Sequence, residues 1–135
     1  MARKDKKQKS VKSSTLIEKK VADILSSMQV SFKQEVTIGK YTVDFLVNDT
    51  YIIECYGDFW HCNPEKYSSD YFNKGKRKTA KEIWERDLDR RKTFESMGYK
   101  FLSLWESEIN KNSKNVRQKI KRMVKQKRRE IWLQK

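Results

Sequence analysis

Alternating apolar and polar residues in the middle of the chain predict a β-hairpin. Val43, Phe45 and Val47 occupy every second position of a run that begins at Tyr41, and a second run opens at 52 with two isoleucines. The three residues 48–50, Asn-Asp-Thr, separate the runs. Branched and aromatic residues at a period of two, interrupted by such a turn, are typical of two antiparallel strands. The stretch 41–64 is therefore expected to organise the fold.

The length of the turn determines which residues of the hairpin face each other. With 48–50 as the loop, Val47 faces Tyr51 and Asp44 lies directly opposite Glu54, with Cβ atoms roughly 5 Å apart. Two carboxylates at that distance repel, so the pair must take up a proton or hold a cation. A hard divalent ion such as Mg2+ suits an all-oxygen site. A loop longer or shorter by one residue would move one carboxylate to the other face.

Helical periodicity precedes the hairpin, with apolar residues at helical spacing over about 15–28. Glu18 follows Thr15 at the spacing of a capping box, in which a glutamate satisfies an amide at the helix start. On spacing alone, this structural role is the favoured one for Glu18. A strand near 31–38 and a turn at Gly39-Lys40 complete the approach to the hairpin.

A second helix is expected over about 80–97, ending at Gly98, and a buried strand over 99–105. A carboxylate on the core-facing side of a helix is costly unless it is paired. Asp87 is either half of a structural pair with Arg91, four residues later, or it reaches a carboxylate site or orients a catalytic group. The apolar stripe comprises Ala80, Ile83, Trp84, Leu88 and Phe94, and Asp87 and Arg91 fall inside it.

The charge of the chain is concentrated at its ends. The net charge is +14, but residues 1–12 hold six basic residues and one acid, and residues 110–135 hold eleven and one. The body between them keeps 15 basic and 16 acidic residues. Residues 1–12 are expected to be a disordered tail, and 110–135 a final basic helix with Val116, Ile120, Met123, Val124, Ile131 and Trp132 on its apolar face. Such ends bind polyanions, nucleic acid above all, or serve only as solubilising tails.

Two further stretches are candidates for function. In the polar loop 63–79, aromatic residues alternate with cations, which suits nucleic-acid contact, although the rings could equally pack on the body. The single histidine, His61, lies seven residues after Glu54, where it is either a structural residue or a catalyst. Cys55, His61 and Cys62 lack a fourth ligand, so no structural zinc is expected. The basic residues of the loop 63–79 that are candidates for DNA binding are Lys74, Lys76, Arg77 and Lys78.

Length and composition place the chain in one class. Its 135 residues fit a single domain, no apolar run is long enough to span a bilayer, and no signal segment follows the basic start. Its two cysteines suit a reducing compartment. A cytoplasmic protein without a membrane partner is the expectation.

Several segments together resemble a known nuclease family. VDF, IIECYGDFWHCNP, EIWERDLDRR and GYKFLSLWESEI are similar to the very-short-patch-repair (Vsr) endonucleases. They are closer still to the phage homing endonucleases with an E-D-x-H-D signature, a branch of the PD-(D/E)xK nucleases. The resemblance covers roughly 14–109. It implies an α/β (α+β) domain with an αβββαβ restriction-endonuclease-like core, a mixed sheet flanked by helices, in a bacterial or phage-infected cell.

The resemblance also implies roles. Glu18 would be the helix-borne acid, Asp44 the metal-binding aspartate, His61 the catalytic histidine and Asp87 its partner. The second ligand of Mg2+, for which Mn2+ could substitute, would be the Glu54 carboxylate or the main-chain oxygen of Cys55. The reaction implied is hydrolysis of phosphodiester bonds in double-stranded DNA. Phe59 or Trp60 would insert into the base stack.

The chain departs from the family in three respects. Asp58 and Asn63 stand where the repair enzymes carry a zinc cluster, which favours the homing branch over a strand-nicking mismatch-repair enzyme. Tyr56 replaces the lysine of the superfamily's E-x-K motif, so His61 must do more of the base chemistry. The basic ends have no counterpart in the family's motif, and a homing enzyme would normally carry a further sequence-reading domain. A double-strand break from one active site needs two chains or two visits, so a homodimer on DNA is one arrangement. The competing class is a non-catalytic DNA-binding module.

Overall fold

The computed structural model describes the backbone of residues 13–133 and the side chains of residues 15–125. The expected basic tail 1–12 and the apolar side chains of Ile131 and Trp132 lie outside these ranges. In chain order the elements are α2 (Ser13–Ser27), β1 (Phe32–Ile38), β2 (Tyr41–Val47), β3 (Tyr51–Tyr56), β4 (Phe72–Asn73), β5 (Lys78–Thr79), α3 (Ala80–Ser96), β6 (Lys100–Trp105), α4 (Glu106–Lys111) and α5 (Ser113–Leu133).

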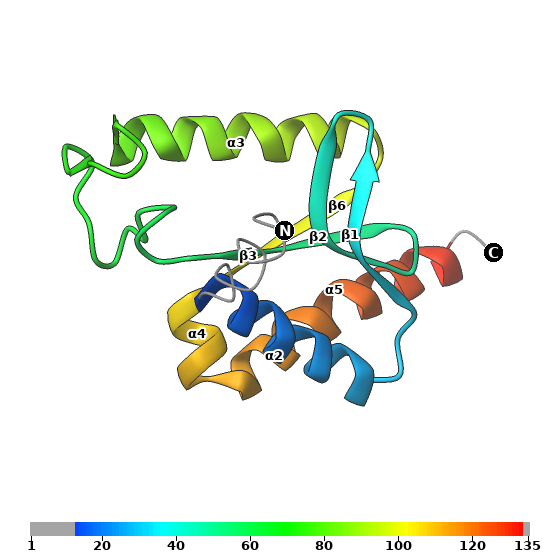
Figure 1. The fold of residues 1–135 in the computed structure, drawn as a ribbon. Helices are drawn as coiled ribbons and strands as arrows, with labels where there is room; N and C mark the ends of the chain where they lie inside the picture. Colours follow the sequence, from blue (N-terminus) through cyan, green and yellow to red (C-terminus); the bar gives the residue numbers. More distant parts are fainter. Residues whose placement is uncertain (1–12, 134–135) are drawn as a thin grey trace, which may run out of the picture.

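A mixed four-stranded sheet in the order β1-β2-β3-β6 forms the centre of this single α+β domain. β1, β2 and β3 are antiparallel neighbours, and β6 joins β3 in parallel after α3 has crossed one face of the sheet. Figure 1 shows α3 on that face and α2, α4 and α5 on the other. The expected fold class, a mixed sheet flanked by helices, is confirmed.

The predicted hairpin register is confirmed, but it is shorter than expected. Val47 pairs with Tyr51, and the ladder continues through Leu46–Ile52 to Phe45–Ile53, where the paired residues end. The loop residues Asn48 and Asp49 both have positive φ, 51° and 55°, a conformation that Asn and Asp tolerate in hairpin turns. The expected pairing of Asp44 with Glu54 would be the next step, and it does not form.

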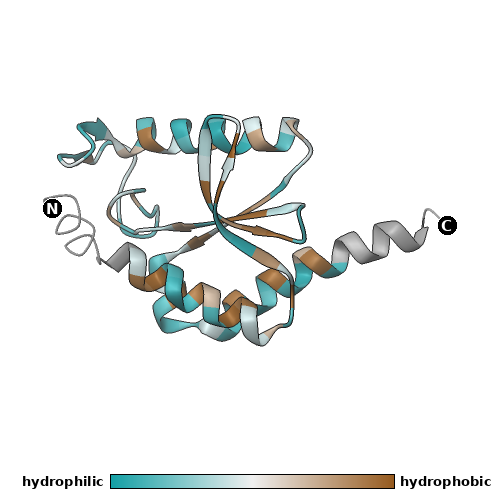
Figure 2. Cartoon of the chain, turned by 45° about the vertical axis from the view of Figure 1, so that its right-hand side comes forward, coloured by the Kyte–Doolittle hydropathy of each residue, from teal (hydrophilic) through white to brown (hydrophobic). Residues whose placement is uncertain are grey.

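Each face of the sheet has its own apolar core. One cluster packs α2, α4 and α5 on β3 through Ile17, Leu25, Ile53 and other buried residues, and Val116 and Ile120 of α5 belong to it. The other packs α3 on the sheet through Phe94. In Figure 2 hydrophobic residues run along the strands and recur on α2 and α5, whereas α3 is mostly hydrophilic. The beginning of the basic C-terminal segment is therefore part of the core.

The start of α2 corrects one of the sequence interpretations. α2 begins at Ser13, two residues before Thr15, so Thr15 lies inside the helix and the proposed capping box with Glu18 is wrong. A capping box does form at α3, where Thr79 and Glu82 satisfy each other's backbone amides. Gly98 ends α3 as predicted, with a φ of 98° that favours glycine.

The other differences concern 63–79 and the C-terminal segment. The polar loop contains the short pair β4–β5. The single basic helix expected over 110–135 is two helices, which break at Asn112, whose side-chain oxygen accepts a hydrogen bond from the Asn115 amide. The helices of the described residues include none that is long and apolar enough to cross a membrane.

Candidate active site

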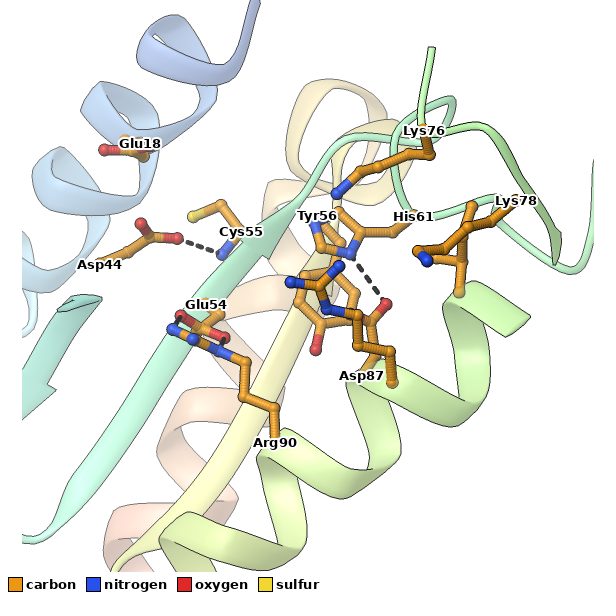
Figure 3. A pocket seen from close by; sticks show the side chains of 12 residues that line it. Glu18, Asp44, Glu54, Cys55, Tyr56, His61, Lys76, Lys78, Asp87 and Arg90 are labelled. Carbon is orange, nitrogen blue, oxygen red and sulfur yellow. Dashed lines mark hydrogen bonds and ion pairs between the residues drawn. The ribbon is translucent and has the colours of Figure 1, made fainter. Parts of the chain in front are cut away.

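A cavity of about 300 Å³ opens where β2 and β3 stop pairing. Side chains from four parts of the fold converge there: α2, the two strands, the segment after β3, and α3 (Figure 3). It is lined by Glu18, Asp44, Glu54, Cys55, Tyr56, His61, Lys76, Lys78, Ile83, Arg86, Asp87 and Arg90. All four residues of the resembled signature, Glu18, Asp44, His61 and Asp87, are therefore in one cavity.

Asp44 occupies a gap in the sheet. Within the described residues it has no ladder partner on either side, because the β2–β3 pairs end at Phe45 and the β1–β2 pairs omit Glu35. Glu35 has a positive φ of 50°. Asp44 Oδ2 instead accepts a hydrogen bond of 2.8 Å from the backbone amide of Cys55. A carboxylate is thus held at the strand edge by a main-chain donor.

The same hydrogen bond locates the main-chain oxygen of Cys55. In an extended strand the N–H and C=O groups of one residue point to the same side. The Cys55 carbonyl therefore faces the side on which Asp44 lies, next to the gap that β2 leaves. Asp44 and this carbonyl together supply two oxygen ligands of the kind that Mg2+ accepts.

Glu54 has a different partner from the one expected. Arg90 of α3 binds it through two parallel hydrogen bonds, Nε to Oε1 at 3.0 Å and Nη2 to Oε2 at 2.8 Å. The Glu54 side chain is only 9% exposed. The negative charge of Glu54 is therefore balanced by the Arg90 guanidinium, and not by a cation shared with Asp44.

His61 and Asp87 are in direct contact. His61 Nδ1 lies 2.9 Å from Asp87 Oδ2, and their side chains are 25% and 20% exposed. The imidazole also stacks on Tyr56, with ring centroids 4.0 Å apart and planes 6° from parallel. Nε2 of the ring has no hydrogen-bond partner among the described residues. The histidine is thus fixed on one edge and one face, with its second nitrogen free.

The structure decides between the two interpretations of Asp87. Arg91, the alternative partner, bonds to Glu95 at 3.4 Å on the exposed side of α3. The predicted structural pair with Asp87 is therefore wrong, and the predicted contact with a group of the site is present. The apolar stripe was also drawn too wide, because Leu88 is 48% exposed.

Two carboxylates of the cavity, Glu18 and Asp44, retain protons more strongly than usual. Burial, together with the charges of Asp44 and Glu35, raises the pKa of Glu18 from 4.5 to about 7. Burial raises the pKa of Asp44 from 3.8 to about 6, despite the opposing hydrogen bond from Cys55. Burial likewise raises the pKa of the Cys55 thiol, so this sulfur stays protonated. Anions crowded in this way favour the arrival of a cation.

These residues fit a hard divalent metal ion only in an open arrangement. Among residues 15–125, no three His, Cys, Asp or Glu side chains form a ready-made metal cage. Mg2+ does not require one, because it keeps several waters and is commonly held by one or two carboxylates and a substrate phosphate. Asp44 and the Cys55 carbonyl could bind it directly, with Glu18 across the cavity.

Hydrogen bonds stabilise the turn after β3, the region where the Vsr repair enzymes that the sequence resembles carry zinc. Asp58 is buried and accepts hydrogen bonds from Asn63 Nδ2 at 3.1 Å and Lys66 Nζ at 2.7 Å. Burial alone would raise the pKa of Asp58, but these bonds outweigh it and lower the pKa. A buried, charge-assisted network thus shapes the turn that carries His61.

Of the aromatic and basic candidates for DNA contact, only Lys76 and Lys78 line the cavity. Phe59 and Trp60 are 37% and 48% exposed and touch each other with ring centroids 5.1 Å apart. A Cβ at Gly75 would come within 2.6 Å of the Trp60 ring, so only glycine lets the loop approach this ring. Lys76 and Lys78 line the cavity, whereas Lys74 and Arg77 are exposed outside it.

Sequence reasoning missed Arg86 and Arg90, which line the cavity, and the contact of Tyr56 with His61. A signal for Arg90 was available. It lies three residues after Asp87, so it projects from a neighbouring position on the same side of the helix.

Comparison with known proteins gives a fold and no sequence family. Neither a protein-family model nor a curated protein matches the chain. A solved structure titled "Homing Endonuclease I-Bth0305I Catalytic Domain" is similar to it, with a TM-score of 0.57 and 22% sequence identity. The similarity covers 78% of this chain and 89% of that one. The chain therefore shares its fold with the catalytic domain of a homing endonuclease.

Proposed function

We propose that this chain is a DNA endonuclease that hydrolyses phosphodiester bonds with Mg2+, for which Mn2+ can substitute. One observation carries the proposal: a histidine paired with an aspartate faces the same cavity as two carboxylates with raised pKa values. The shared fold with a homing endonuclease catalytic domain supports it and suggests the biological role. A homing endonuclease is the form we favour.

The chain's own residues account for the proton chemistry. The free Nε2 of His61 accepts the proton of the attacking water, which a neutral imidazole can do near pH 7. Asp87 holds Nδ1 protonated and stabilises the imidazolium as it forms. Asp44 and the Cys55 carbonyl would hold the metal ion, which when bound would stabilise the charge that develops on the phosphate.

A plasmid assay tests the catalytic proposal. Supercoiled plasmid is incubated with the protein and Mg2+, with Asp44→Ala and a chelator control alongside. Conversion to nicked or linear DNA by the wild type alone is the expected result. Binding without cleavage by both proteins would leave the non-catalytic DNA-binding module as the function. Competition by RNA stronger than by DNA would instead indicate an RNA partner.

The C-terminal helix α5 is the proposed DNA-binding element outside the cavity. Lys121 and Lys125 are exposed on it, and removing one lysine that neutralises a phosphate should lower the slope of log affinity against log salt by about 0.9. Replacing both by glutamine should therefore flatten the slope, whereas the control pair Lys92→Gln and Lys100→Gln should not. Substitution is preferable to truncation, because Val116 and Ile120 are core residues. Equal slopes would place the DNA-binding surface elsewhere.

A double-strand break made by one active site requires two protomers or two binding events. Sizing the complex on cleaved duplex, with nicked and linear products resolved over time, tests the proposed homodimer on DNA. A monomer that produces only nicks would favour the strand-nicking alternative.

A further inference from the structure

Arg90 is held at the cavity wall by several contacts at once. Besides its two bonds to Glu54, Nη2 donates to the carbonyl oxygen of Thr42 at 2.8 Å. The guanidinium also lies over two rings, with its carbon 5.3 Å from the centroid of Tyr41 and 5.1 Å from that of Phe94. Its contacts join α3 to β2 and β3, so its position is fixed before any substrate arrives.

The remaining donors of Arg90 are free. A guanidinium has five N–H groups, and three of them are used by Glu54 and Thr42. Both hydrogens of Nη1 have no partner among the described residues, and Arg90 lines the cavity. Figure 3 shows the group beside Glu54, on the side of the cavity where Asp44 lies.

We infer that Arg90 binds a non-bridging oxygen of the reacting phosphate through Nη1, and that Glu54 is its positioning residue and not a metal ligand. The inference rests on the proposed endonuclease function. It chooses between the two alternatives for the second metal ligand. The Cys55 carbonyl would bind the metal together with Asp44, and Glu54 would bind Arg90 instead.

The physical argument concerns preorganisation. A fixed donor stabilises developing charge without the cost of being ordered during the reaction, and a guanidinium matches phosphate geometry. β3 itself carries no lysine or arginine that could bring a cation to the phosphate. Arg90 reaches the same cavity from α3, and its conformation is already determined by its hydrogen bonds to Glu54 and Thr42 and by the aromatic rings beneath it.

The decisive experiment separates binding of substrate from support of Glu54. Single-turnover cleavage of plasmid is measured for Arg90→Gln, Glu54→Gln and the double variant, with Arg91→Gln as the matched control. Arg91 is the adjacent arginine, pairs with Glu95 and does not line the cavity. Arg90→Gln should be slower by about 100-fold, the typical loss of one oxyanion donor, and Arg90→Lys by less.

The double variant distinguishes the two roles. It removes both charges, so no unpaired buried charge remains and thermal stability should recover relative to Arg90→Gln. Its cleavage rate should nevertheless stay as low as that of Arg90→Gln, since effects of residues acting as a unit are not additive. A double variant that cleaves like the wild type would overturn the inference, because Arg90 would then only neutralise Glu54.

Metal affinity provides a readout that needs no cleavage. Mn2+ binding, followed by its electron paramagnetic resonance signal, should be weakened at least tenfold in Asp44→Ala. It should change by no more than a few-fold in Glu54→Gln, through the removed charge, and should not weaken in Arg90→Gln. Loss of Mn2+ binding in Glu54→Gln as large as in Asp44→Ala would make Glu54 a ligand and refute its assignment. Absence of cleavage by the wild type would refute the proposed function instead.

Discussion

The two ends of the β2–β3 hairpin use the same strands in opposite ways. At the loop end, three ladder pairs run from Val47–Tyr51 to Phe45–Ile53, and all six residues are buried. One position further, Asp44 is not paired in the ladder, and its carboxylate accepts a hydrogen bond from the backbone amide of Cys55. The Glu54 carboxylate is bound by Arg90. The loop end therefore contributes to stability. At the cavity end, backbone groups that would be hydrogen-bonded in a regular ladder face the cavity.

A sheet can form an active site at the point where one of its ladders ends and still keep its apolar core. Ending the ladder early exposes polar backbone, which must find other partners. The Asp44 carboxylate and the arginine from α3 are those partners here. The strands before this point are apolar on both faces, because helices cover both.

The largest effect is expected at the site end, from His61→Ala. Loss of the general base should slow cleavage by about 100-fold or more while DNA binding persists. Asp87→Asn should also lose rate, and the double variant should be scarcely slower than His61→Ala, because the two act as a unit. Single-turnover plasmid cleavage and a gel-shift assay measure the two properties.

Multiplying losses in the double variant would mean that Asp87 serves something other than His61. Full activity of His61→Ala would end the assignment of the histidine as base.

A smaller loss of rate is expected when the imidazole loses its stacking partner. Tyr56→Phe keeps a ring against His61 and should cleave almost as fast as the wild type, whereas Tyr56→Leu should be slower by about tenfold, since stacking fixes the imidazole. Equal rates for the two variants would show that only apolar bulk matters at this position.

At the loop end, the effect should be on stability and not on rate. Ile53→Val removes one methylene from a fully buried side chain and should lower the free energy of unfolding by about 1 kcal/mol. Cleavage by the folded protein should be unchanged. Urea unfolding and single-turnover cleavage at a temperature well below the transition test this; a tenfold slower reaction would show that the two ends are coupled.

The sequence predicted the loop end fully. The apolar runs and the Asn-Asp turn between them determine the pairing, because the turn type and loop length of a hairpin set its register. The cavity's residues were identified in large part by resemblance, which also implied the contact of Asp87 with His61. The inward position of a carboxylate on α3 predicted only that Asp87 reaches the site or orients a catalytic group.

What the sequence could not give was the choice of partners at the site end. Extending the register by one pair placed Asp44 against Glu54, but α3 brings Arg90 to Glu54 and the ladder stops. Local patterns carry no information on such a long-range choice. The capping box at Thr15 failed for a related reason, since helix starts are the least determined boundaries.

The smallest expected effect is the pH dependence of stability that the site end imposes. Glu18 and Asp44 bind protons more tightly in the folded chain, with pKa values of about 7 and about 6 against ordinary values of 4.5 and 3.8. At a pH between the ordinary and the raised pKa values, the folded state holds more protons than the unfolded state. The contribution of Glu18 and Asp44 to the free energy of unfolding therefore falls as pH rises. The penalty is absent below about pH 4 and complete above about pH 7.

A divalent ion should offset this penalty, because it binds the deprotonated carboxylates. The rise in melting temperature caused by Mg2+ should therefore be small at pH 5 and reach a few degrees at pH 8. Without metal, Glu18→Gln and Asp44→Asn should melt higher than the wild type at pH 8 and close to it at pH 4, and Asp44→Asn should no longer respond to Mg2+. Because other groups also titrate, the quantity to compare is the difference between wild type and variant at each pH. A wild type that gains as much from Mg2+ at pH 5 as at pH 8 would place the metal on groups other than these two carboxylates.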